Sequence, residues 1–490
     1  MIKLLDCTLR DGGYYTNWDF NEKLVKNYLK YIENLPIEYI EIGYRSNVNN
    51  GYCGEYFYLP KATLEFIKQN SNKKIAIMLN LKEFYNSNNL SLLDRLENSV
   101  DLVRIATDPY KIDIAIKLSK EIKKRGFRVA INIMYISKLD HKHSFFDSIE
   151  ELSIYTDILN LVDSYGTIYP EQLRLLIHKI QDRTNIDLGF HGHNNLELAF
   201  SNTFVALENG VKYIDSTILG MGRGAGNLKT ELILTYLKSM QKLDVDLNSL
   251  SKLNELFTPL LQKYKWGTNL AYMISGAYSL AQKDVMEYLE IDRYSMGTII
   301  KKIQNNVENI SQYNLNLKSK NVLIIGGADS VKEHINAIKS FVMNHNITII
   351  HATSKHLKIF DNIDSLQLFA VAGDESSKIE NIPSSIKYAI TSSKPMVDSL
   401  EVNTFRLDDI SFTKYIDSPL SISLEISNLL KATNIYLVGF DGYSSLKSKK
   451  ELYLMNENQE IVNSFDKNLI FLTQTNYKNI IQKSIYGLIQ

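Results

Sequence analysis

Cysteine is scarce in this chain of 490 residues, which contains only Cys7 and Cys53. Two cysteines cannot build the disulfide framework of a small secreted protein, and their scarcity fits a reducing compartment. The sequence also lacks an uncharged apolar run long enough to span a bilayer, and its N-terminus lacks the basic and apolar segments of a secretion signal. We therefore expect a soluble, cytoplasmic protein with no membrane partner.

An excess of charge of either sign is also missing. Lysine plus arginine and aspartate plus glutamate both number 55, so the formal net charge is zero. A neutral chain has no general electrostatic attraction to nucleic acid, and we expect no nucleic-acid partner. Hydrophobic residues make up 44% of the chain, which is enough for sizeable cores, and two domains are the expectation at this length.

Short apolar runs alternate with longer amphipathic segments through the first 240 residues or so. This pattern is typical of repeated strand and helix units around a parallel sheet. Eight strands in this length predict a (β/α)8 TIM barrel, because an open doubly wound sheet usually has fewer. The predicted strands are Ile2 to Asp6, Tyr39 to Gly43, Lys74 to Leu79, Leu102 to Ala106, Arg128 to Ile133, Ile158 to Asp163, Asp187 to Phe190 and Tyr213 to Ser216.

Residues that can bind a metal follow two of these strands. Arg10 and Asp11 come after the first strand, where we expect a loop, and His191 and His193 follow the seventh. In an extended segment, side chains two residues apart leave on the same face, so the two imidazoles can act together. One carboxylate and two imidazoles suit Mn²⁺, Fe²⁺, Co²⁺ or Zn²⁺, and they suit Mg²⁺ if substrate oxygens and water complete an octahedron.

A glycine-rich segment, Gly222 to Asn227, follows the eighth predicted strand. Strands one, seven and eight are neighbours in a closed barrel, and barrel active sites lie at the C-terminal ends of the strands. These distant segments should therefore converge at one site. Other polar residues on the same rim are Glu41, Arg45 and Asp163, which we expect either to support the rim or to contact substrate.

Together, three segments resemble the signatures of the DRE-TIM metallolyase superfamily, which includes 4-hydroxy-2-oxovalerate aldolase, hydroxymethylglutaryl-CoA lyase and isopropylmalate synthase. The resemblance covers roughly residues 1 to 280. The segments are Asp6-Cys7-Thr8-Leu9-Arg10-Asp11-Gly12, His191-Gly192-His193-Asn194 and Gly222-Arg223-Gly224-Ala225-Gly226-Asn227. The resemblance implies that Asp11, His191 and His193 bind a divalent metal. It also implies that Asn227 supports or completes the coordination.

The resemblance further implies a carbon–carbon lyase that joins or splits a 2-oxo acid, such as pyruvate, and an aldehyde. Such a reaction passes through an enolate, which a metal can stabilise as a Lewis acid. We expect Mn²⁺, with Mg²⁺, Co²⁺ or Zn²⁺ as alternatives. Arg10, as a directional donor of fixed charge, would hydrogen-bond the enolate oxygen.

Two other functions remain open at this stage. One is an acyl-CoA condensing enzyme or lyase of the same superfamily, and the other is a non-catalytic binding protein on a barrel scaffold. Acyl-CoA members commonly carry Gly-Glu-Arg before Ala-Gly-Asn, whereas Gly222-Arg223-Gly224 is nearer to the aldolase version. A homo-oligomer is compatible with either function.

The general base departs from the pattern of the best-known aldolases. Those carry a histidine three residues after the metal-binding aspartate, where this chain has Tyr14. A tyrosine has a pKa near 10 and is a weak base at neutral pH unless a nearby cation lowers that value. Tyr14 and Tyr15 are the candidates, with lining of the barrel mouth as the alternative. Tyr278 lies in a segment similar to one in pyruvate aldolases and is either a site residue or a packing residue.

Beyond the barrel, which we place at residues 1–245, the sequence predicts a helical extension at 246–315 that packs on the barrel, and a Rossmann-like α/β domain at 320–490. The turn Gly326-Gly327-Ala328-Asp329-Ser330 follows a buried strand in that domain. It lacks the third glycine of a dinucleotide motif and the lysine of a P-loop, so it supports phosphate or sugar-nucleotide binding only weakly. The fused domain suggests carbohydrate or surface-polysaccharide metabolism.

Overall fold

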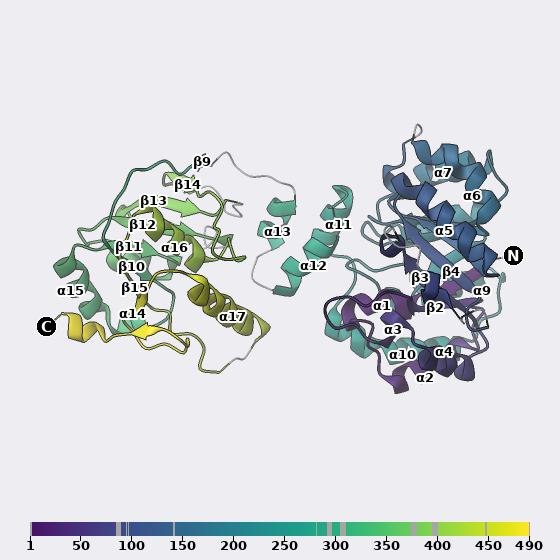
Figure 1. Cartoon of the computed structure of the whole chain (residues 1–490), viewed down its shortest axis with the longest axis horizontal. Coiled ribbons are helices and arrows are strands. Elements are labelled where there is room, and N and C mark those ends of the chain that lie inside the picture. The colour runs from purple at the N-terminus through teal and green to yellow at the C-terminus, as the bar shows by residue number, and fades with distance from the viewer. Residues whose placement is uncertain are drawn as a thin grey trace. The chain divides into compact units, whose positions relative to one another are not determined.

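The computed structural model divides the chain into two compact units, Met1–Val285 and Met286–Gln490, and each is described by itself (Figure 1). The residues predicted as a helical extension of the barrel are therefore split between the two units. The structure describes residues 2–84, 90–94, 96, 98–140, 143–280, 282–291, 296–303, 310–373, 379, 381–393, 400–445 and 448–489. Among these residues, the helices are too short or too polar to cross a membrane.

The first unit is built on a closed barrel of eight parallel strands, which confirms the predicted TIM barrel. Its first and last strands pair directly, with Leu4 opposite Ile214, so the ring closes where the three motifs were expected to meet. The strands are β1 (Lys3–Asp6), β2 (Tyr39–Tyr44), β3 (Lys74–Asn80), β4 (Leu102–Thr107), β5 (Arg128–Ile133), β6 (Ile158–Asp163), β7 (Asp187–Gly192) and β8 (Tyr213–Ser216).

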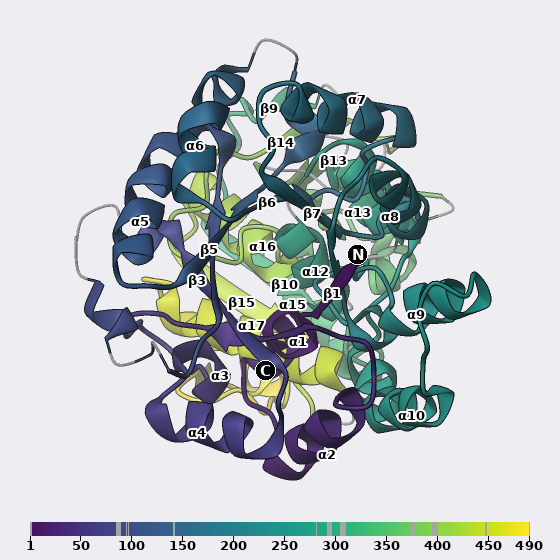
Figure 2. The ribbon, with the colours of Figure 1, turned by 90° about the vertical axis from the view of Figure 1, so that its right-hand side faces the viewer.

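Helices surround the ring of strands (Figure 2). Their apolar faces explain their positions: α2 buries Val25, Tyr28, Leu29 and Ile32, which are spaced along one side of a helix. The helices of this unit are α1 (Thr8–Thr16), α2 (Glu22–Ile32), α3 (Glu55–Tyr58), α4 (Lys61–Asn70), α5 (Ile112–Lys124), α6 (Ile149–Tyr155), α7 (Pro170–Gln181), α8 (Ala199–Glu208), α9 (Thr230–Ser239), α10 (Leu247–Tyr264) and α11 (Leu270–Ala277). The boundary between the two units falls inside α12 (Gln282–Ile291), and α13 (Met296–Ile303) belongs to the second unit.

The prediction of a loop after the first strand is wrong. Helix α1 begins at Thr8, only two residues after the last residue of β1. Arg10 and Asp11 lie in the first turn of this helix. Two glycines inside it allow close packing. A Cβ atom on Gly12 would lie 2.7 Å from the Met221 sulfur, and one on Gly13 would overlap the indole of Trp18. The side chains of Arg10 and Asp11 are thus carried by a packed helix.

The second unit contains a nine-stranded sheet in which every described pairing is parallel, as the predicted Rossmann-like domain requires. The strand order is β17-β16-β15-β10-β11-β12-β13-β14-β9. The strands are β9 (Ser311–Gln312), β10 (Asn321–Ile325), β11 (Thr348–His351), β12 (Gln367–Val371), β13 (Ile386–Thr391), β14 (Thr404–Arg406), β15 (Asn434–Val438), β16 (Leu469–Phe471) and β17 (Ile481–Gln482).

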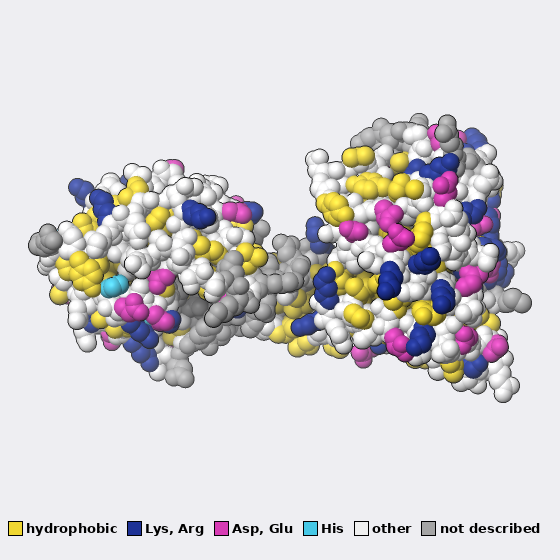
Figure 3. All heavy atoms as spheres, turned by 90° about the horizontal axis from the view of Figure 1, so that it is seen from below, with side chains coloured by type: hydrophobic (Ala, Val, Ile, Leu, Met, Phe, Trp, Pro, Cys, Tyr) yellow, Lys and Arg dark blue, Asp and Glu magenta, His cyan; other side chains and the backbone are white. Residues whose placement is uncertain are grey.

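Helices pack on both faces of this sheet, because alternate residues of its central strands point to opposite sides. Leu323 and Ile325 of β10 belong to one apolar cluster, with helices α14 (Ser330–Glu333) and α15 (Ile335–His345). Val322 and Ile324 belong to another, with α16 (Pro419–Leu429) and α17 (Lys449–Ser464). On the molecular face in Figure 3, basic and acidic side chains are interspersed, in keeping with the zero net charge.

Candidate active site

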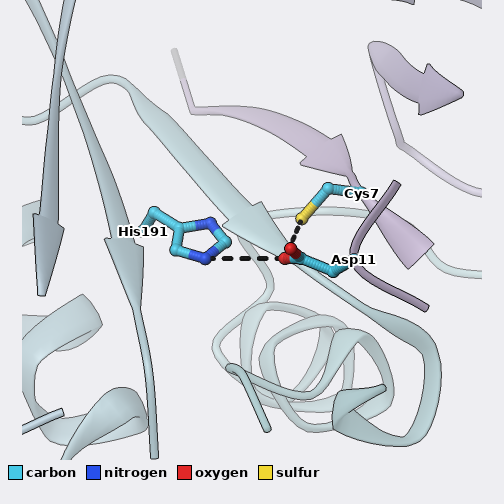
Figure 4. Close-up of side chains that lie close together, drawn as sticks. All are labelled: Cys7, Asp11 and His191. Carbon is cyan, nitrogen blue, oxygen red and sulfur yellow. Dashed lines mark hydrogen bonds and ion pairs between the residues drawn. The ribbon is translucent and has the colours of Figure 1, made fainter. Parts of the chain in front are cut away.

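Three side chains come together where β1 and β7 end: Cys7, Asp11 and His191 (Figure 4). Their donor atoms all lie within 4.8 Å of one another, and all three residues are buried. His191 Nε2 and Cys7 Sγ each lie 3.6 Å from Oδ2 of Asp11. Burial, reinforced by the nearby Asp11 charge, raises the pKa of the Cys7 thiol well above its usual value. This favours a neutral thiol that donates to its neighbours, including the carbonyl of Ser216 at 3.4 Å.

Both histidines of the predicted pair are oriented through Nδ1. Nδ1 of His191 lies 3.0 Å from Oδ2 of Asp215, and Nδ1 of His193 lies 2.8 Å from the carbonyl oxygen of Asp163. Both partners are acceptors, so Nδ1 is the donor in each ring and Nε2 is the nitrogen left to face a metal. Burial and the neighbouring His191 lower the pKa of His193 to about 3, so it is neutral at physiological pH. The rings lie 4.9 Å apart, as the two-residue spacing predicts.

Asn227 completes a set of oxygen and nitrogen donors. Its Nδ2 donates to Oδ2 of Asp11 at 2.7 Å, and its Oδ1 is buried without a hydrogen-bond partner among the described residues. A buried carbonyl oxygen rarely stays unpaired. A cation held by Asn227 Oδ1, Asp11 and Nε2 of His191 and His193 would pair it, so the residues present fit a divalent metal.

The glycine-rich segment explains how Asn227 reaches this position. Gly226 has φ of +78°, and a Cβ atom there would lie 2.4 Å from the carbonyl oxygen of Gly220. A Cβ atom on Gly222 would lie 2.6 Å from the side-chain amide of Asn227. The turn therefore needs glycine at both positions. It brings Asn227 into a backbone bridge with His193 at the end of β7.

Arg10 lies in a buried network of charges. Its Nε donates to Oε2 of Glu41 at 2.7 Å, and its Nη1 donates to Asp11. Nη1 of Arg104, on β4, lies 3.1 Å from the same Glu41 oxygen. Glu41 is fully buried in β2, and its contact with Arg10 holds the Arg10 side chain in place. Although burial opposes it, the charge of Arg10 and then that of His191 lower the pKa of Asp11.

The network continues across the barrel interior to Asp215 on β8. Nη2 of Arg104 and Nδ2 of Asn160 both donate to Oδ2 of Asp215, the second at 3.1 Å. Despite the opposing effect of burial, Arg104 and the hydrogen bond with His191 hold the pKa of Asp215 well below its usual value. Asp215 is therefore an ionised acceptor that fixes the ring of His191. Through His191 and Asp11 the network returns to Arg10, which closes a ring of buried polar groups.

Tyr14 lies one turn of α1 beyond Asp11 and has a cation beside it. Its Oη is 3.0 Å from Oη of Tyr44, and the guanidinium of Arg223 lies 3.9 Å from its ring centroid. Burial, with the charge of Tyr14 next, raises the pKa of Tyr44 well above its usual value, so Tyr44 is a neutral phenol. Tyr15 instead accepts a hydrogen bond from the backbone of Gly224 at 3.2 Å. The hydroxyl of Tyr14 therefore meets another side-chain hydroxyl and its ring meets a guanidinium, whereas the hydroxyl of Tyr15 meets the backbone.

The structure gives the other predicted residues different surroundings. Arg45 donates to the backbone carbonyls of Tyr58, Leu59 and Leu92, which is a structural role. Asp163 accepts from the amides of Thr167 and Ile168 at 3.1 Å and supports its own loop. Tyr278 lies at the end of α11 with 56% of its surface exposed, in contrast to the buried donors around Asp11.

The sequence analysis missed Cys7, Arg104, Asn160 and Asp215 as members of the site. A signal was present for two of them, because Arg104 and Asp215 are charged residues in the middle of apolar strands. A charge in such a position needs a partner inside the fold. The partner itself could not be predicted, since β4 and β8 are distant in the sequence.

Comparison with known proteins gives the family. Residues 103–257 match the HMGL-like family. The solved N-terminal domain of a candidate aldolase from Bacteroides vulgatus is 47% identical, with a TM-score of 0.58, and the match covers 61% of this chain and 99% of that domain. The chain belongs to the HMGL-like family. This confirms the resemblance that its three motifs indicated and makes the protein an enzyme of the carbon–carbon lyase class.

Two curated relatives of this HMGL-like protein carry more specific names. The 4-hydroxy-2-oxovalerate aldolase of Bacillus cereus is 27% identical over 300 residues, which cover 57% of this chain and 83% of that enzyme. The oxaloacetate decarboxylase of Mycobacterium tuberculosis is 25% identical over 243 residues, which cover 48% of this chain and 69% of that enzyme. The HMGL-like barrel thus lies within the aldolase family, and the site that matches its motifs offers a place for a divalent cation.

Proposed function

We propose that this enzyme is a divalent-metal-dependent aldolase that joins or splits a 2-oxo acid, such as pyruvate, and an aldehyde. The observation that carries the proposal is the position of Arg10 next to Asp11, with both imidazoles oriented through Nδ1. Asp11, His191, His193 and Asn227 would hold the metal. When bound, the metal supplies Lewis-acid stabilisation of the enolate.

Arg10 stabilises the developing charge on the enolate oxygen in this proposal. Arg10 is 7% exposed, and its guanidinium is held by Glu41 at 2.7 Å, so its remaining donors have a fixed direction. The indole N–H of Trp18 donates to the Arg10 carbonyl at 2.9 Å and fixes the backbone as well. A preorganised donor of this kind does not need to reorganise as charge develops.

Tyr14 takes the proton from the hydroxyl group of the substrate when the carbon–carbon bond breaks, and it returns that proton in the reverse direction. The guanidinium of Arg223 lies 3.9 Å from the ring centroid of Tyr14, and the hydroxyl of Tyr44 lies 3.0 Å from the hydroxyl of Tyr14, so two polar groups surround the proposed base. Tyr278 is exposed, and it is not part of the proposed chemistry.

The metal is Mn²⁺ in this proposal, with Mg²⁺, Co²⁺ or Zn²⁺ as alternatives. The donor set consists of carboxylate and amide oxygens and two imidazole nitrogens, which suits Mn²⁺. Cys7 adds a sulfur to the same cluster of donor atoms, and a thiolate ligand there would favour Zn²⁺ instead.

The test uses the full-length protein, loaded with Mn²⁺ and mixed with pyruvate in deuterium oxide. We expect deuterium to enter the methyl group, and we expect a chelator to stop this exchange. Mass spectrometry of mixtures with a panel of aldehydes, including sugars, should then find a condensation product. Exchange into acetyl-CoA but not into pyruvate would replace this proposal with the acyl-CoA alternative.

A further inference from the structure

The second unit has a large cavity at one end of its sheet. The cavity has a volume of about 610 Å³, within the range of about 300–1,000 Å³ of small-molecule sites. It is lined by the segments that follow β10, β11, β12 and β15, and by the first turn of α16 and one side of α17. All four strand segments are at the C-terminal ends of parallel strands. The mechanism proposed for the barrel uses none of these residues.

The cavity lies where the order of the strands in the sheet reverses. From β10 the chain continues outward through β11 to β14 on one side, and it then returns to β15 on the other side of β10. The sheet therefore reverses its winding between β10 and β15. In open α/β sheets, ligands bind outside the carboxyl ends of the strands at such a reversal. Both segments that flank it, Gly326–Asp329 and Gly439–Tyr443, line the cavity.

The two flanking segments are held together rigidly. The amide of Ala328 donates to the carbonyl of Gly439 at 3.0 Å, and the hydroxyl of Ser330 lies 2.5 Å from Oδ1 of Asp441. A Cβ atom on Gly326 would lie 2.3 Å from the Gly439 carbonyl oxygen, so these backbones approach as closely as glycine allows. The cavity wall is therefore preformed, as small-molecule sites usually are.

A polar atom without a partner lies beside this turn. Oγ1 of Thr353, after β11, is buried and has no hydrogen-bond partner among the described residues. A Cβ atom on Gly327 would lie 3.4 Å from it, so Gly327 and the Thr353 hydroxyl face each other. Both residues line the cavity. A ligand with polar groups would satisfy this hydroxyl.

The charges that line the cavity define the class of ligand. Lys355 and Lys450 are the cations, and Asp329, Asp441 and Glu457 are the acids, among the described lining residues. The acids exceed the cations by one, so a small free anion is not favoured. Lys355 is 3.0 Å from Asp329 in an exposed, weak pair, and it can exchange that partner for a phosphate.

The opposite wall suits a ligand with hydroxyl groups and a ring. The acids Asp441 and Glu457 can accept hydrogen bonds from sugar hydroxyls. Asn458, Phe440 and Tyr443 offer an amide and two aromatic faces for a base. We propose that this cavity binds a nucleoside phosphate, with its phosphate between the turn at Gly327 and Lys355, and its nucleoside against the β15 segment and α17.

Titration calorimetry of the full-length protein tests the proposal with ATP, GTP, CTP and UTP as probes, and with the four nucleosides and inorganic pyrophosphate as controls. We expect at least one nucleotide to bind with Kd below about 1 mM, and its nucleoside and pyrophosphate to bind at least about tenfold more weakly. The proposal would be overturned if all four nucleotides failed to bind. It would also be overturned if pyrophosphate or a nucleoside bound as tightly as the nucleotide.

Two pairs of variants test whether the nucleotide binds in this cavity. Gly327→Ala adds a methyl group whose nearest neighbour is Thr353, at 3.4 Å, whereas in Gly487→Ala the same group meets nothing within 4 Å. Lys355→Gln removes a lining cation, and Lys358→Gln removes an exposed lysine of the same segment that does not line the cavity. The first member of each pair should weaken binding by about tenfold or more, and the control should leave it unchanged. Unchanged affinity in both Gly327→Ala and Lys355→Gln would refute the assignment.

Discussion

Oδ2 of Asp215 lies 3.0 Å from Nδ1 of His191, and this contact decides which nitrogen of the imidazole carries the proton. Asp215 is itself held by Arg104 and Asn160. The orientation of His191 thus depends on side chains from β4 and β6 that do not reach the proposed metal. Such outer partners of metal ligands commonly matter almost as much as the ligands themselves.

Replacement of Asp215 by Asn should weaken metal binding, because the amide can present a donor to Nδ1 and favour the wrong tautomer. We expect a loss of about 10- to 100-fold in Mn²⁺ affinity, measured by titration of the metal-free protein. Asp244→Asn, at an exposed acid, is the control. Urea unfolding should show a loss of stability on the order of 3 kcal/mol, because the buried Arg104 loses one of its two charged partners. Unchanged affinity would make Asp215 purely structural.

The proposed ligands can be tested directly through the metal content. His191→Ala and Asp11→Ala each remove one donor from the proposed set and should abolish stoichiometric binding of Mn²⁺ in elemental analysis. His178→Ala is the matched control, since His178 is an exposed histidine on α7 that pairs with Asn209. Full occupancy in either test variant would contradict the ligand assignment.

Arg10→Lys keeps the positive charge but loses the planar guanidinium group with its fixed set of N–H donors. If Arg10 stabilises the enolate, turnover should fall by on the order of 100-fold or more while the metal content stays the same. Arg174→Lys, at a surface arginine paired with Glu171, should retain wild-type turnover. Wild-type turnover in Arg10→Lys would show that Arg10 has only a structural role, through its pair with Glu41.

The two tyrosines of α1 should behave differently. Tyr14→Phe removes the proposed base, and aldol cleavage should slow by about 100-fold or more at neutral pH. Tyr15→Phe should retain activity to within a few fold, because Tyr15 packs against Tyr264 and Trp266 and meets the Gly224 backbone. Steady-state rates of cleavage across pH would measure both. Equal losses in the two variants would argue against Tyr14 as the base.

The second unit should lose stability in acid. Burial lowers the pKa of His351 to about 4, well below its usual value of 6.5. The unfolded chain therefore takes up a proton between these values that the folded chain does not, so stability is complete above pH 6.5 and falls as the pH drops toward 4. The loss is about 3 kcal/mol for this group.

The variant His351→Gln should remove this part of the pH dependence. Hydrogen exchange in β10 and β11 at pH 7 and pH 4.5, with and without urea, would measure the stability of the unit. His356 stays in the variant and its pKa is lowered too, mainly by burial, so a smaller acid effect should persist. Identical pH dependence in wild type and variant would show that His351 does not set it.

The eight barrel strands could be predicted because each is an apolar run bounded by polar segments. Strands of a parallel sheet are buried on both faces, and this burial requires such runs. Helix α1 could not. Gly12 and Gly13 have low helix propensity, and the helix forms because Met221 and Trp18 pack against them. The short strands at and next to the two edges of the second sheet also lacked a signal, since β9, β14, β16 and β17 have only two or three residues each.

The candidate metal ligands could be proposed from sequence because each follows a strand of the barrel, and the strand order brings the C-terminal ends of these strands together. The network that orients them could not. Arg104 pairs with Glu41 and Asp215, which lie on strands that are distant in the sequence. Spacing along the chain carries no information about such a pairing, which depends on the register of the closed barrel.

The ring of buried charges also has a consequence for the order of binding. Asp11, Glu41 and Asp215 bring three carboxylates to it, and Arg10 and Arg104 bring two guanidinium groups, so the ring by itself carries one negative charge. A 2-oxo acid is an anion and is repelled by that sign. A divalent cation reverses it, so the enzyme should show ordered binding kinetics, with the ion entering first and the acid second.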